Sequence, residues 1–332
     1  MSTNPKLTIA IPTFNRPEEL AETLRRLVPQ VSDDWVLHIH DNCSEPPIAE
    51  TQAELLAQFD KNRFTIIRNV ANIGANANIL RCFELCETEW LVVLGDDDLI
   101  EPDYVSSFLN LIAEHPDIVF ANFASCFNPR KADITTTGLA GFCQGLDEWG
   151  NVLFITASIF NRKAVVPYLR YGYNYIYALS PHIALVMQCL RQGHGKCMFL
   201  KKEIVSSILV EARGWPGFNT NKYAYLLELI PDRPSQEAFF KRISVHLIPA
   251  RRVASFLIER FHNIGEDARA RFEMRASCLT FLRTSFLDFV TLPFLRFFVR
   301  HPRLGSRIVR LGRRCRGYPP PKQTGSMDIF SG

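Results

Sequence analysis

The first 123 residues alternate short apolar runs with amphipathic segments. The run Leu7-Thr8-Ile9-Ala10-Ile11 is rich in β-formers and is stopped by Pro12, and Pro17 then opens a segment with leucines on one helical face. The pattern predicts strands over residues 7–11, 35–39, 64–67, 90–94 and 117–123, and helices over residues 17–28, 48–59, 75–86 and 104–113. Strands that alternate with helices in this way predict an α/β fold with a parallel sheet covered on both faces.

The pattern is less regular after residue 123. It predicts a strand over 152–160, a helix over 181–190 and extended structure over 197–209, and after residue 217 it becomes helical. We therefore expect a main domain over residues 1–230, with a first half over 1–123 and a second over 124–230. A helical extension over 231–318 and a disordered tail over 319–332, which begins with three prolines, complete the predicted organisation.

Polar residues follow three of the predicted strands. They form the segment Pro12-Thr13-Phe14-Asn15-Arg16, the pair Asp41-Asn42 and the run Gly95-Asp96-Asp97-Asp98. Ligands of open parallel sheets bind beyond the carboxyl ends of the strands, so these three segments are expected to converge on one crevice.

The run Asp96-Asp97-Asp98 predicts a metal site. Three adjacent carboxylates repel one another, and hard cations such as Mg²⁺ or Mn²⁺ take one or two carboxylates together with substrate phosphates. Helix capping or a solvated turn would explain one aspartate, but three in a row at the end of a strand favour the metal.

The charge of the chain is unevenly distributed. Residues 1–240 hold 20 basic and 28 acidic residues, whereas residues 241–316 hold 17 basic and 5 acidic ones. Phenylalanines alternate with arginines in the basic part, which predicts an amphipathic helix on an anionic membrane surface and does not resemble a nucleic-acid-binding motif. A helical cap packed on the main domain is the alternative. The sequence shows neither a secretory signal nor an apolar run long enough to span a bilayer, so we expect a cytoplasmic protein attached peripherally to the inner face of the membrane.

Four segments together resemble the family 2 glycosyltransferases of the GT-A fold. They are the sequence LTIAIPTFNR over residues 7–16, Asp41-Asn42-Cys43-Ser44, Asn72-Ile73-Gly74, and Leu94-Gly95-Asp96-Asp97-Asp98 followed by Pro102. Their order and spacing match over roughly the first 125 residues, and the Gly-Asp-Asp-Asp run is most similar to bacterial abequosyltransferase-like enzymes. The resemblance implies a Rossmann-like GT-A domain with a helical, basic C-terminal extension.

The resemblance also implies roles for individual residues. It places Pro12, Thr13, Asn15 and Arg16 in the first nucleotide-binding loop, Asp41 at the nucleobase and Asp96 on the ribose and diphosphate side. It makes Asp97 a metal ligand, and Asp98, its neighbour in the acidic run, is the second predicted metal ligand. Arg213 follows the last predicted strand and is a candidate for the diphosphate.

The chain departs from the family pattern at the catalytic base. Many members carry an acidic pair at a helix start roughly 80 to 90 residues after the acidic motif. Here that position reads Ala178-Leu179-Ser180-Pro181-His182, where His182 is the one good proton acceptor. His182 as base and His182 as a packing residue stay open, and Asp147 or Glu148 is the nearest alternative base.

The expected activity is transfer of a sugar from a nucleoside diphosphate sugar to an acceptor hydroxyl. The resemblance implies a metal-dependent reaction with inversion at the anomeric carbon, and the acceptor we expect is a lipid-linked saccharide of bacterial surface-polysaccharide assembly. A non-catalytic sugar-nucleotide-binding or scaffold subunit of a membrane complex is the rival interpretation, because the acidic base is missing. A nucleotidyltransferase would require a glycine-rich phosphate loop that the sequence does not contain.

Overall fold

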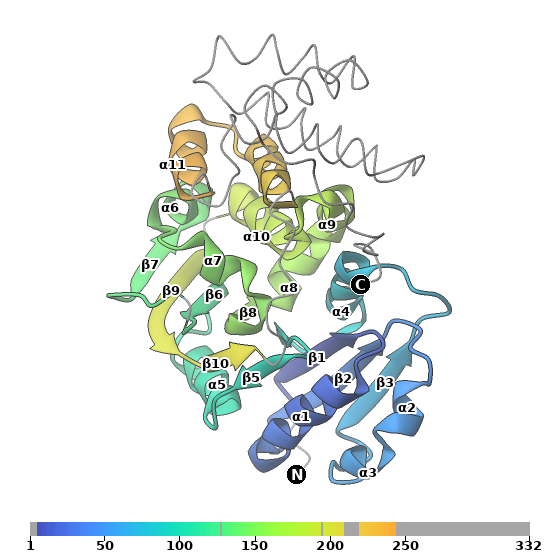
Figure 1. Cartoon of the computed structure of the whole chain (residues 1–332). Helices are drawn as coiled ribbons and strands as arrows, with labels where there is room; N and C mark the ends of the chain where they lie inside the picture. The colour runs from blue at the N-terminus through green and yellow to red at the C-terminus, as the bar shows by residue number, and fades with distance from the viewer. Residues whose placement is uncertain (1–4, 127, 194, 209–218, 244–332) are drawn as a thin grey trace, which may run out of the picture. The chain divides into compact units, whose positions relative to one another are not determined.

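The computed structural model describes residues 5–126, 128–193, 195–208 and 219–243 (Figure 1). Within this part the strands are β1 Leu7–Thr13, β2 Trp35–Asp41, β3 Phe64–Arg68, β4 Trp90–Val93, β5 Asp98–Ile100, β6 Ile118–Ala124, β7 Ile134–Thr137, β8 Ser158–Asn161, β9 Lys196–Glu203 and β10 Val205–Ile208. The α-helices are α1 Pro17–Leu27, α2 Ile48–Thr51, α3 Ala53–Leu56, α4 Ala75–Leu85, α5 Tyr104–Glu114, α6 Gly138–Gly145, α7 Trp149–Leu153, α8 Arg162–Val165, α9 Leu169–Asn174, α10 Pro181–Gln192 and α11 Arg233–Ile243. Short 3-10 helices are η1 Val28–Gln30, η2 Ile155–Ala157, η3 Val166–Tyr168, η4 Ile176–Ala178 and η5 Asn219–Leu229.

An eight-stranded sheet in the order β3-β2-β1-β4-β8-β6-β9-β7 forms the centre of the structure. Strands β3, β2, β1 and β4 are parallel, as the alternation of strands and helices predicted. Strand β8 runs antiparallel to β4 and β6, and β7 runs antiparallel to β9, so the sheet is mixed and mostly parallel. Strands β5 and β10 pair separately as an antiparallel ribbon.

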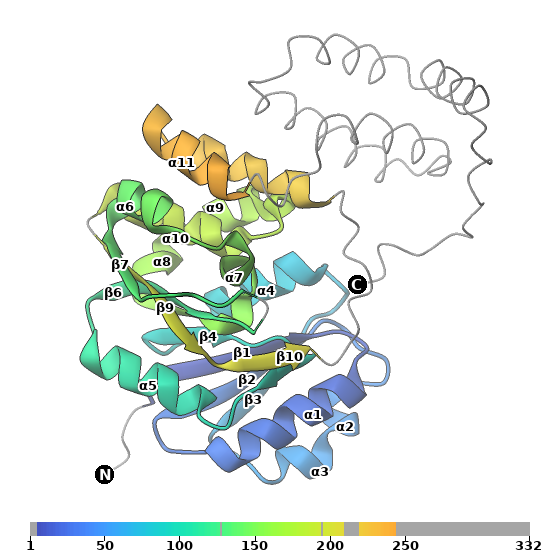
Figure 2. The ribbon, with the colours of Figure 1, turned by 60° about the vertical axis from the view of Figure 1, so that its left-hand side comes forward.

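Helices cover both faces of the sheet (Figure 2). On one face, Leu20, Leu24 and Leu27 of α1 pack in one buried cluster with Leu7 and Ile9 of β1, and α5 adds Tyr104, Phe108 and Ile112 to that cluster. On the other face lie α4 and α10, with the buried residues Leu80 and Phe83 in α4 and nine buried residues in α10. Burial of this size is the main source of stability in such a fold.

Several boundaries differ from those that the pattern predicted. The predicted helix over 48–59 is two short helices, α2 and α3. The predicted strand over 152–160 is wrong for its first part, where the end of α7 and η2 precede β8.

The chain divides into two units, and the first holds residues 1–213 and 226–242. The sheet and all of its covering helices belong to the first unit. Of the predicted basic extension, α11 lies within the described residues. In α11, Phe239 packs edge-on against Trp149 with 5.2 Å between the ring centroids. The rest of the extension and the tail lie outside the described residues. In the described part of the chain, no helix is both long and apolar enough to cross a membrane.

Candidate functional site

The polar segments predicted at the strand ends meet at the carboxyl edge of the parallel strands. Thr13 at the end of β1 is in register with Asp41 at the end of β2, and Leu94 after β4 donates its backbone N–H to the carbonyl of Ala10 in β1. The topology therefore brings the loop 12–16, the loop after Asp41 and the run 95–98 to one edge of the sheet.

Arg16 joins the first loop to the acidic run. Its Nη1 donates to Asp96 Oδ1 at 3.1 Å and to Asp97 Oδ2 at 2.7 Å, and its side chain is 40% exposed. Burial works to lower the pKa of Arg16, and the charges of Asp96 and Asp97 outweigh it, so the pKa is raised overall. Burial raises the pKa of Asp96 to about 6, against the opposing effect of Arg16. The two carboxylates thus converge on one cation in a partly open position.

Asp98, which the sequence analysis placed with Asp97 as a metal ligand, points elsewhere. Its carboxylate is buried and accepts a hydrogen bond from the hydroxyl of Thr156, a residue of η2. A Cβ on Gly95 would collide with this carboxylate, so Asp98 folds back over the turn. Burial raises the pKa of Asp98 to about 7. The Asp98 carboxylate therefore points toward Thr156, whereas those of Asp96 and Asp97 point toward Arg16, so the structure does not bring Asp98 together with Asp97 as the predicted pair of metal ligands.

Asp41 is 1% exposed and its carboxylate already has three partners. Arg68 Nη1 donates to Oδ2 at 2.5 Å, the backbone N–H of Ser44 donates to Oδ1 at 2.8 Å, and that of Ile48 donates to Oδ2 at 3.4 Å. Arg68 lies opposite Asp41 in the register of β3 with β2, and hydrogen bonding to Asp41 raises its pKa. Sequence analysis missed Arg68; its position as the last residue of a parallel strand was the available signal.

The other residues of the first loop fix its shape. Asn15 adopts a left-handed backbone with φ of 52°, its N–H donates to Ser44 Oγ at 3.0 Å, and its Oδ1 accepts from the N–H of Glu45 at 2.8 Å. Thr13 is buried at the end of β1, and Pro12 precedes it. These bonds join the loop after β1 to the loop after β2.

Asparagines tie the ends of β2 and β3 to α4. Asn42 Nδ2 donates to Asn72 Oδ1 at 2.8 Å, and Asn69 Nδ2 donates to Asn42 Oδ1 and to Asn78 Oδ1 at 2.9 Å each. Gly74, with φ of 86°, forms the N-cap of α4. Asn72 and Gly74 therefore shape the turn before α4.

His182 is a core residue, which favours the packing role over the role of base among the two alternatives that the sequence left open. It lies in the first turn of α10 at 2% exposure, edge-on to Phe160 with ring centroids 6.0 Å apart, and its Nε2 is 3.3 Å from the carbonyl of Val152. Its Nδ1 is buried and finds no hydrogen-bond partner among the described residues. Burial lowers its pKa to about 4. An acceptor hydroxyl has no access to this imidazole.

Asp147, one of the two alternative bases, is held in an ion pair. Its Oδ1 accepts from Arg130 Nε at 2.9 Å and from the N–H of Glu148 at 2.7 Å. Arg130 has a side chain with 0% exposure. Glu148 is half-buried at the N-cap of α7 and remains the carboxylate candidate. Arg213, the remaining candidate for the diphosphate, lies outside the described residues.

The donor set at Asp96 and Asp97 fits a divalent cation. Two carboxylates converge on the point where Arg16 places its Nη1, and Mg²⁺ or Mn²⁺ typically takes one or two carboxylates and completes its shell with phosphate and water. No group of three or more histidine, cysteine or acidic residues that could hold a metal ion occurs within the described ranges.

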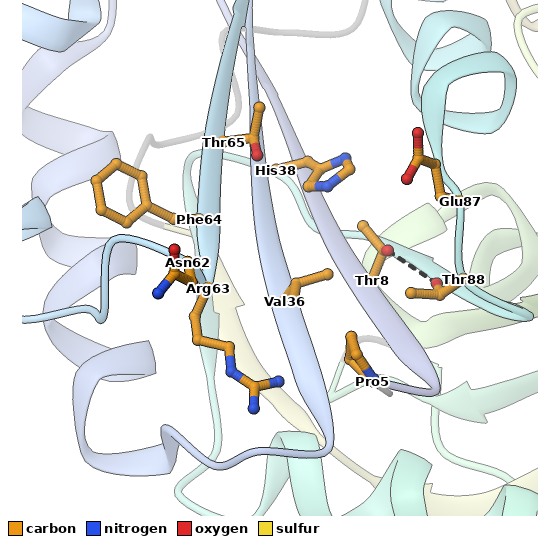
Figure 3. A pocket seen from close by; sticks show the side chains of 10 residues that line it. All are labelled: Pro5, Thr8, Val36, His38, Asn62, Arg63, Phe64, Thr65, Glu87 and Thr88. Atoms are coloured by element: carbon orange, nitrogen blue, oxygen red, sulfur yellow. Dashed lines mark hydrogen bonds between the residues drawn. The ribbon is translucent and has the colours of Figure 1, made fainter. Parts of the chain in front are cut away.

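A cavity of about 340 Å³ lies elsewhere on the sheet (Figure 3). Thr8, Val36, His38 and Thr65 line it from the amino-terminal halves of β1, β2 and β3. Ligands of open parallel sheets bind at the opposite, carboxyl edge, where Arg16, Asp96 and Asp97 meet.

Residues 8–166 match the family model described as "Glycosyl transferase family 2". The chain is 27% identical over 141 residues to an "Uncharacterized glycosyltransferase" of Haemophilus influenzae, covering 42% of this chain and 44% of that protein. It is 31% identical over 113 residues to the "Putative colanic acid biosynthesis glycosyl transferase WcaA" of Escherichia coli, covering 33% of this chain and 38% of that one. The chain thus spans less than half the length of these curated relatives.

Solved structures share the fold. Residues 1–349 of TarS from S. aureus superpose with a TM-score of 0.56 at 14% identity, covering 98% of this chain and 97% of that one. The mannosyltransferase PcManGT from Pyrobaculum calidifontis, in complex with GDP-Man and Mn2+, gives a TM-score of 0.50 at 11% identity and covers 93% of this chain and 88% of that one. At these identities the likeness establishes the GT-A fold.

Proposed function

We propose, from the premise that residues 8–166 form a glycosyl transferase family 2 domain, that the protein transfers a glycosyl unit from a nucleoside diphosphate sugar to an acceptor hydroxyl. The observation that carries the proposal is the convergence of Asp96 and Asp97 on Arg16 at the carboxyl edge of β1, β2 and β4. An edge with two carboxylates, a cation and loop N–H groups suits a diphosphate with its metal.

The donor would lie along the three loops of this edge. Asp96 and Arg16 would face the ribose and diphosphate, with Pro12, Thr13 and Asn15 shaping the loop below them. Asp97, with Asp96 beside it, would hold Mn²⁺ or Mg²⁺, and the cation would offset negative charge on the departing diphosphate. Asp41 and Arg68 would face the nucleobase. The solved structures that share the fold support a nucleoside diphosphate sugar as the donor, since TarS was crystallised with UDP and with UDP-GlcNAc, and PcManGT with GDP-Man and Mn2+.

The expected reaction is a single displacement with inversion at the anomeric carbon. An acceptor hydroxyl attacks that carbon, its proton passes to a base, and the nucleoside diphosphate leaves. Glu148 is the base we propose, because His182 is enclosed in the core and Asp147 is paired with Arg130.

Calorimetry with UDP and GDP in Mn²⁺ tests the donor site. We expect binding that EDTA abolishes, and we expect Asp97→Asn to weaken it by about 10- to 100-fold with stability changed by no more than about 0.5 kcal/mol, since Asp97 is in a polar loop. Asp34→Asn, at an exposed aspartate before β2, is the matched control and should bind normally. Nucleotide affinity that is indifferent to both EDTA and Asp97→Asn would refute the site.

We further propose that the acceptor is a saccharide on a lipid carrier, made available at the inner face of the membrane. The basic, phenylalanine-rich sequence after residue 243 would hold the acidic domain at an anionic surface and raise the local concentration of acceptor. The relative described as a colanic acid biosynthesis transferase supports a role in surface polysaccharide.

Liposome sedimentation tests this attachment. The full chain should bind anionic vesicles in a salt-sensitive way, and a chain ending after Ile243 should not. The cut falls after Ile243 because Phe239 packs on Trp149, and removing α11 would expose that contact. Equal sedimentation of both proteins, or salt-independent binding to neutral vesicles, would favour a helical cap instead.

The burial of His182 also keeps a second candidate in view, a sugar-nucleotide-binding subunit without catalysis. This candidate predicts tight, metal-dependent donor binding with neither transfer nor donor hydrolysis. Release of nucleoside diphosphate from a radiolabelled donor, lost in Glu148→Gln, would decide for the enzyme.

A further inference from the structure

The acidic turn between β4 and β5 is held from the second half of the domain by one threonine. Thr156, in η2, is fully buried, and its hydroxyl donates to the Asp98 carboxylate. The same oxygen accepts the backbone N–H of Gly95 at 2.8 Å. Thr156 thus contacts both ends of the turn Gly95-Asp96-Asp97-Asp98.

Thr156 is itself fixed by the first half. Its carbonyl accepts the hydroxyl of Tyr104 in α5 at 2.7 Å, and Tyr104 is also fully buried. A third contact holds the middle of the turn, where Thr23 Oγ1 of α1 donates to the carbonyl of Asp96 at 2.9 Å. The turn is therefore held at its start through the Gly95 N–H, at its middle through the Asp96 carbonyl and at its end through the Asp98 side chain.

Of the side chains in this turn, those of Asp96 and Asp97 face the edge of the sheet, where both pair with Arg16. Gly95 has no side chain, and the space for one is filled by the Asp98 carboxylate. Without the Thr156 hydroxyl, the Gly95 N–H and the buried Asp98 carboxylate would both lose this partner, and a buried polar group without its partner is destabilising. Opening of the turn would relieve this cost and would separate the two carboxylates that converge on Arg16.

We propose that Thr156 is a positioning residue for the donor site, one that sets Asp96 and Asp97 for the cation without touching the ligand. The inference rests on the proposed function, since it assumes that this edge binds a metal with a nucleoside diphosphate. Partners that orient metal ligands in this way typically change metal affinity by about 10- to 100-fold when they are removed.

Mn²⁺ titration followed by electron paramagnetic resonance, with UDP or GDP present, tests the inference. Thr156→Val keeps the shape and removes the hydroxyl, so Mn²⁺ affinity should fall by about 10- to 100-fold. Thr156→Ser restores the hydroxyl and should bind within about threefold of the unaltered protein. The matched control is Thr8→Val, which removes another fully buried hydroxyl at the opposite end of β1 and should leave Mn²⁺ affinity unchanged.

If Thr156 has only a structural role, Thr156→Val and Thr8→Val should both lower the melting temperature, and both should bind Mn²⁺ with the same affinity. Normal affinity in folded Thr156→Val overturns the inference while the proposed function stands. If Thr156→Val does not fold, Tyr104→Phe takes its place, because it frees the Thr156 carbonyl. It should weaken Mn²⁺ binding by at least about threefold, and unchanged affinity would again overturn the inference. Absence of nucleotide-dependent Mn²⁺ binding in the unaltered protein would instead overturn the proposed function and the inference together.

Discussion

Two arginine–aspartate clusters lie in the two halves of the domain, and they differ in what they leave available. Arg16 contacts Asp96 and Asp97 with a side chain that is 40% exposed. Arg130 pairs with Asp147 at 0% exposure, and its other donors go to the Asn122 carbonyl and side chain and to the carbonyl of Leu200. The Arg16 cluster is exposed enough to contact a ligand, whereas the hydrogen-bond donors of Arg130 are bound to groups within the fold.

The difference shows that an arginine–aspartate pair indicates a binding role or a structural role only when its burial is also known. Asn122 of β6 also donates to the Asn151 carbonyl and to Ser158 Oγ, and Asn151 accepts the hydroxyl of Ser125. This network joins β6, β8 and α7. A buried, fully bonded network of this kind specifies packing, whereas a half-open cluster at strand ends suits binding.

Removal of Arg130 should have the largest effect on stability. Arg130→Met would leave the Asn122 and Leu200 carbonyls and Asp147 without their donor, and breaking a buried pair costs about 3–5 kcal/mol. Because Asp147 is partly exposed, we expect about 3 kcal/mol, measured as a loss in the free energy of unfolding in urea. Folded Arg130→Met should still bind nucleotide normally. If the folded variant binds nucleotide more weakly than the unaltered protein, the Arg130 cluster is not purely structural, and the distinction from the Arg16 cluster is wrong.

Removal of Arg16 should have the opposite signature. Arg16→Met should weaken nucleoside diphosphate binding by about 10- to 100-fold, the value of one charge-assisted hydrogen bond. Its stability should change by less than about 1 kcal/mol, because solvent partly screens the ion pairs of a side chain that is 40% exposed. Arg25→Met is the matched control, on the exposed side of α1. Calorimetry measures the nucleotide affinity and urea unfolding measures the stability of the same samples. A large loss of stability with normal nucleotide affinity would show that Arg16 has a structural role.

The first half of the fold was predictable because its pattern is local. The apolar runs before Pro12, Asp41 and Asp96 became β1, β2 and β4, and parallel topology then brings their ends together without further information. Strands β7 and β8 run against that direction, and the run 152–160 divides between helix and strand. Whether such a short apolar run forms a helix or a strand depends on its packing against helices that are distant in sequence. The spacing of apolar residues alone does not predict that packing.

The site was predictable in location and less so in detail. Asp96, Asp97 and Asp98 are equivalent in sequence, and only the contact with Thr156, 58 residues from Asp98, separates Asp98 from the other two. His182 looks available at a helix start, but Phe160 and the Val152 carbonyl enclose it. The similarity to abequosyltransferase-like enzymes stays a prediction.

The smallest expected effect concerns His182 and acid stability. Burial lowers the pKa of His182 to about 4, below the ordinary value of 6.5 that it regains on unfolding. Between pH 6.5 and 4 the imidazole of His182 is protonated in the unfolded chain and neutral in the folded chain. The free energy of unfolding therefore decreases as the pH falls through that window. At pH 5.5 the penalty is about 1 kcal/mol.

His182→Gln removes the titrating group and keeps a side chain that can donate to the Val152 carbonyl. Its packing cost is the same at every pH, so the difference in unfolding free energy from the unaltered protein should shrink by about 1 kcal/mol between pH 7.5 and 5.5. His40, which is also buried with its pKa lowered to about 3, titrates in both proteins and cancels from the comparison. Donor turnover at pH 7.5 should stay within a few-fold of normal if His182 is a core residue. If His182→Gln instead lowers donor turnover by about 10²-fold or more and leaves the pH dependence of stability unchanged, His182 is a catalytic residue. The second half of this domain would then contribute to the reaction, and the contrast with the open cluster of the first half would be lost.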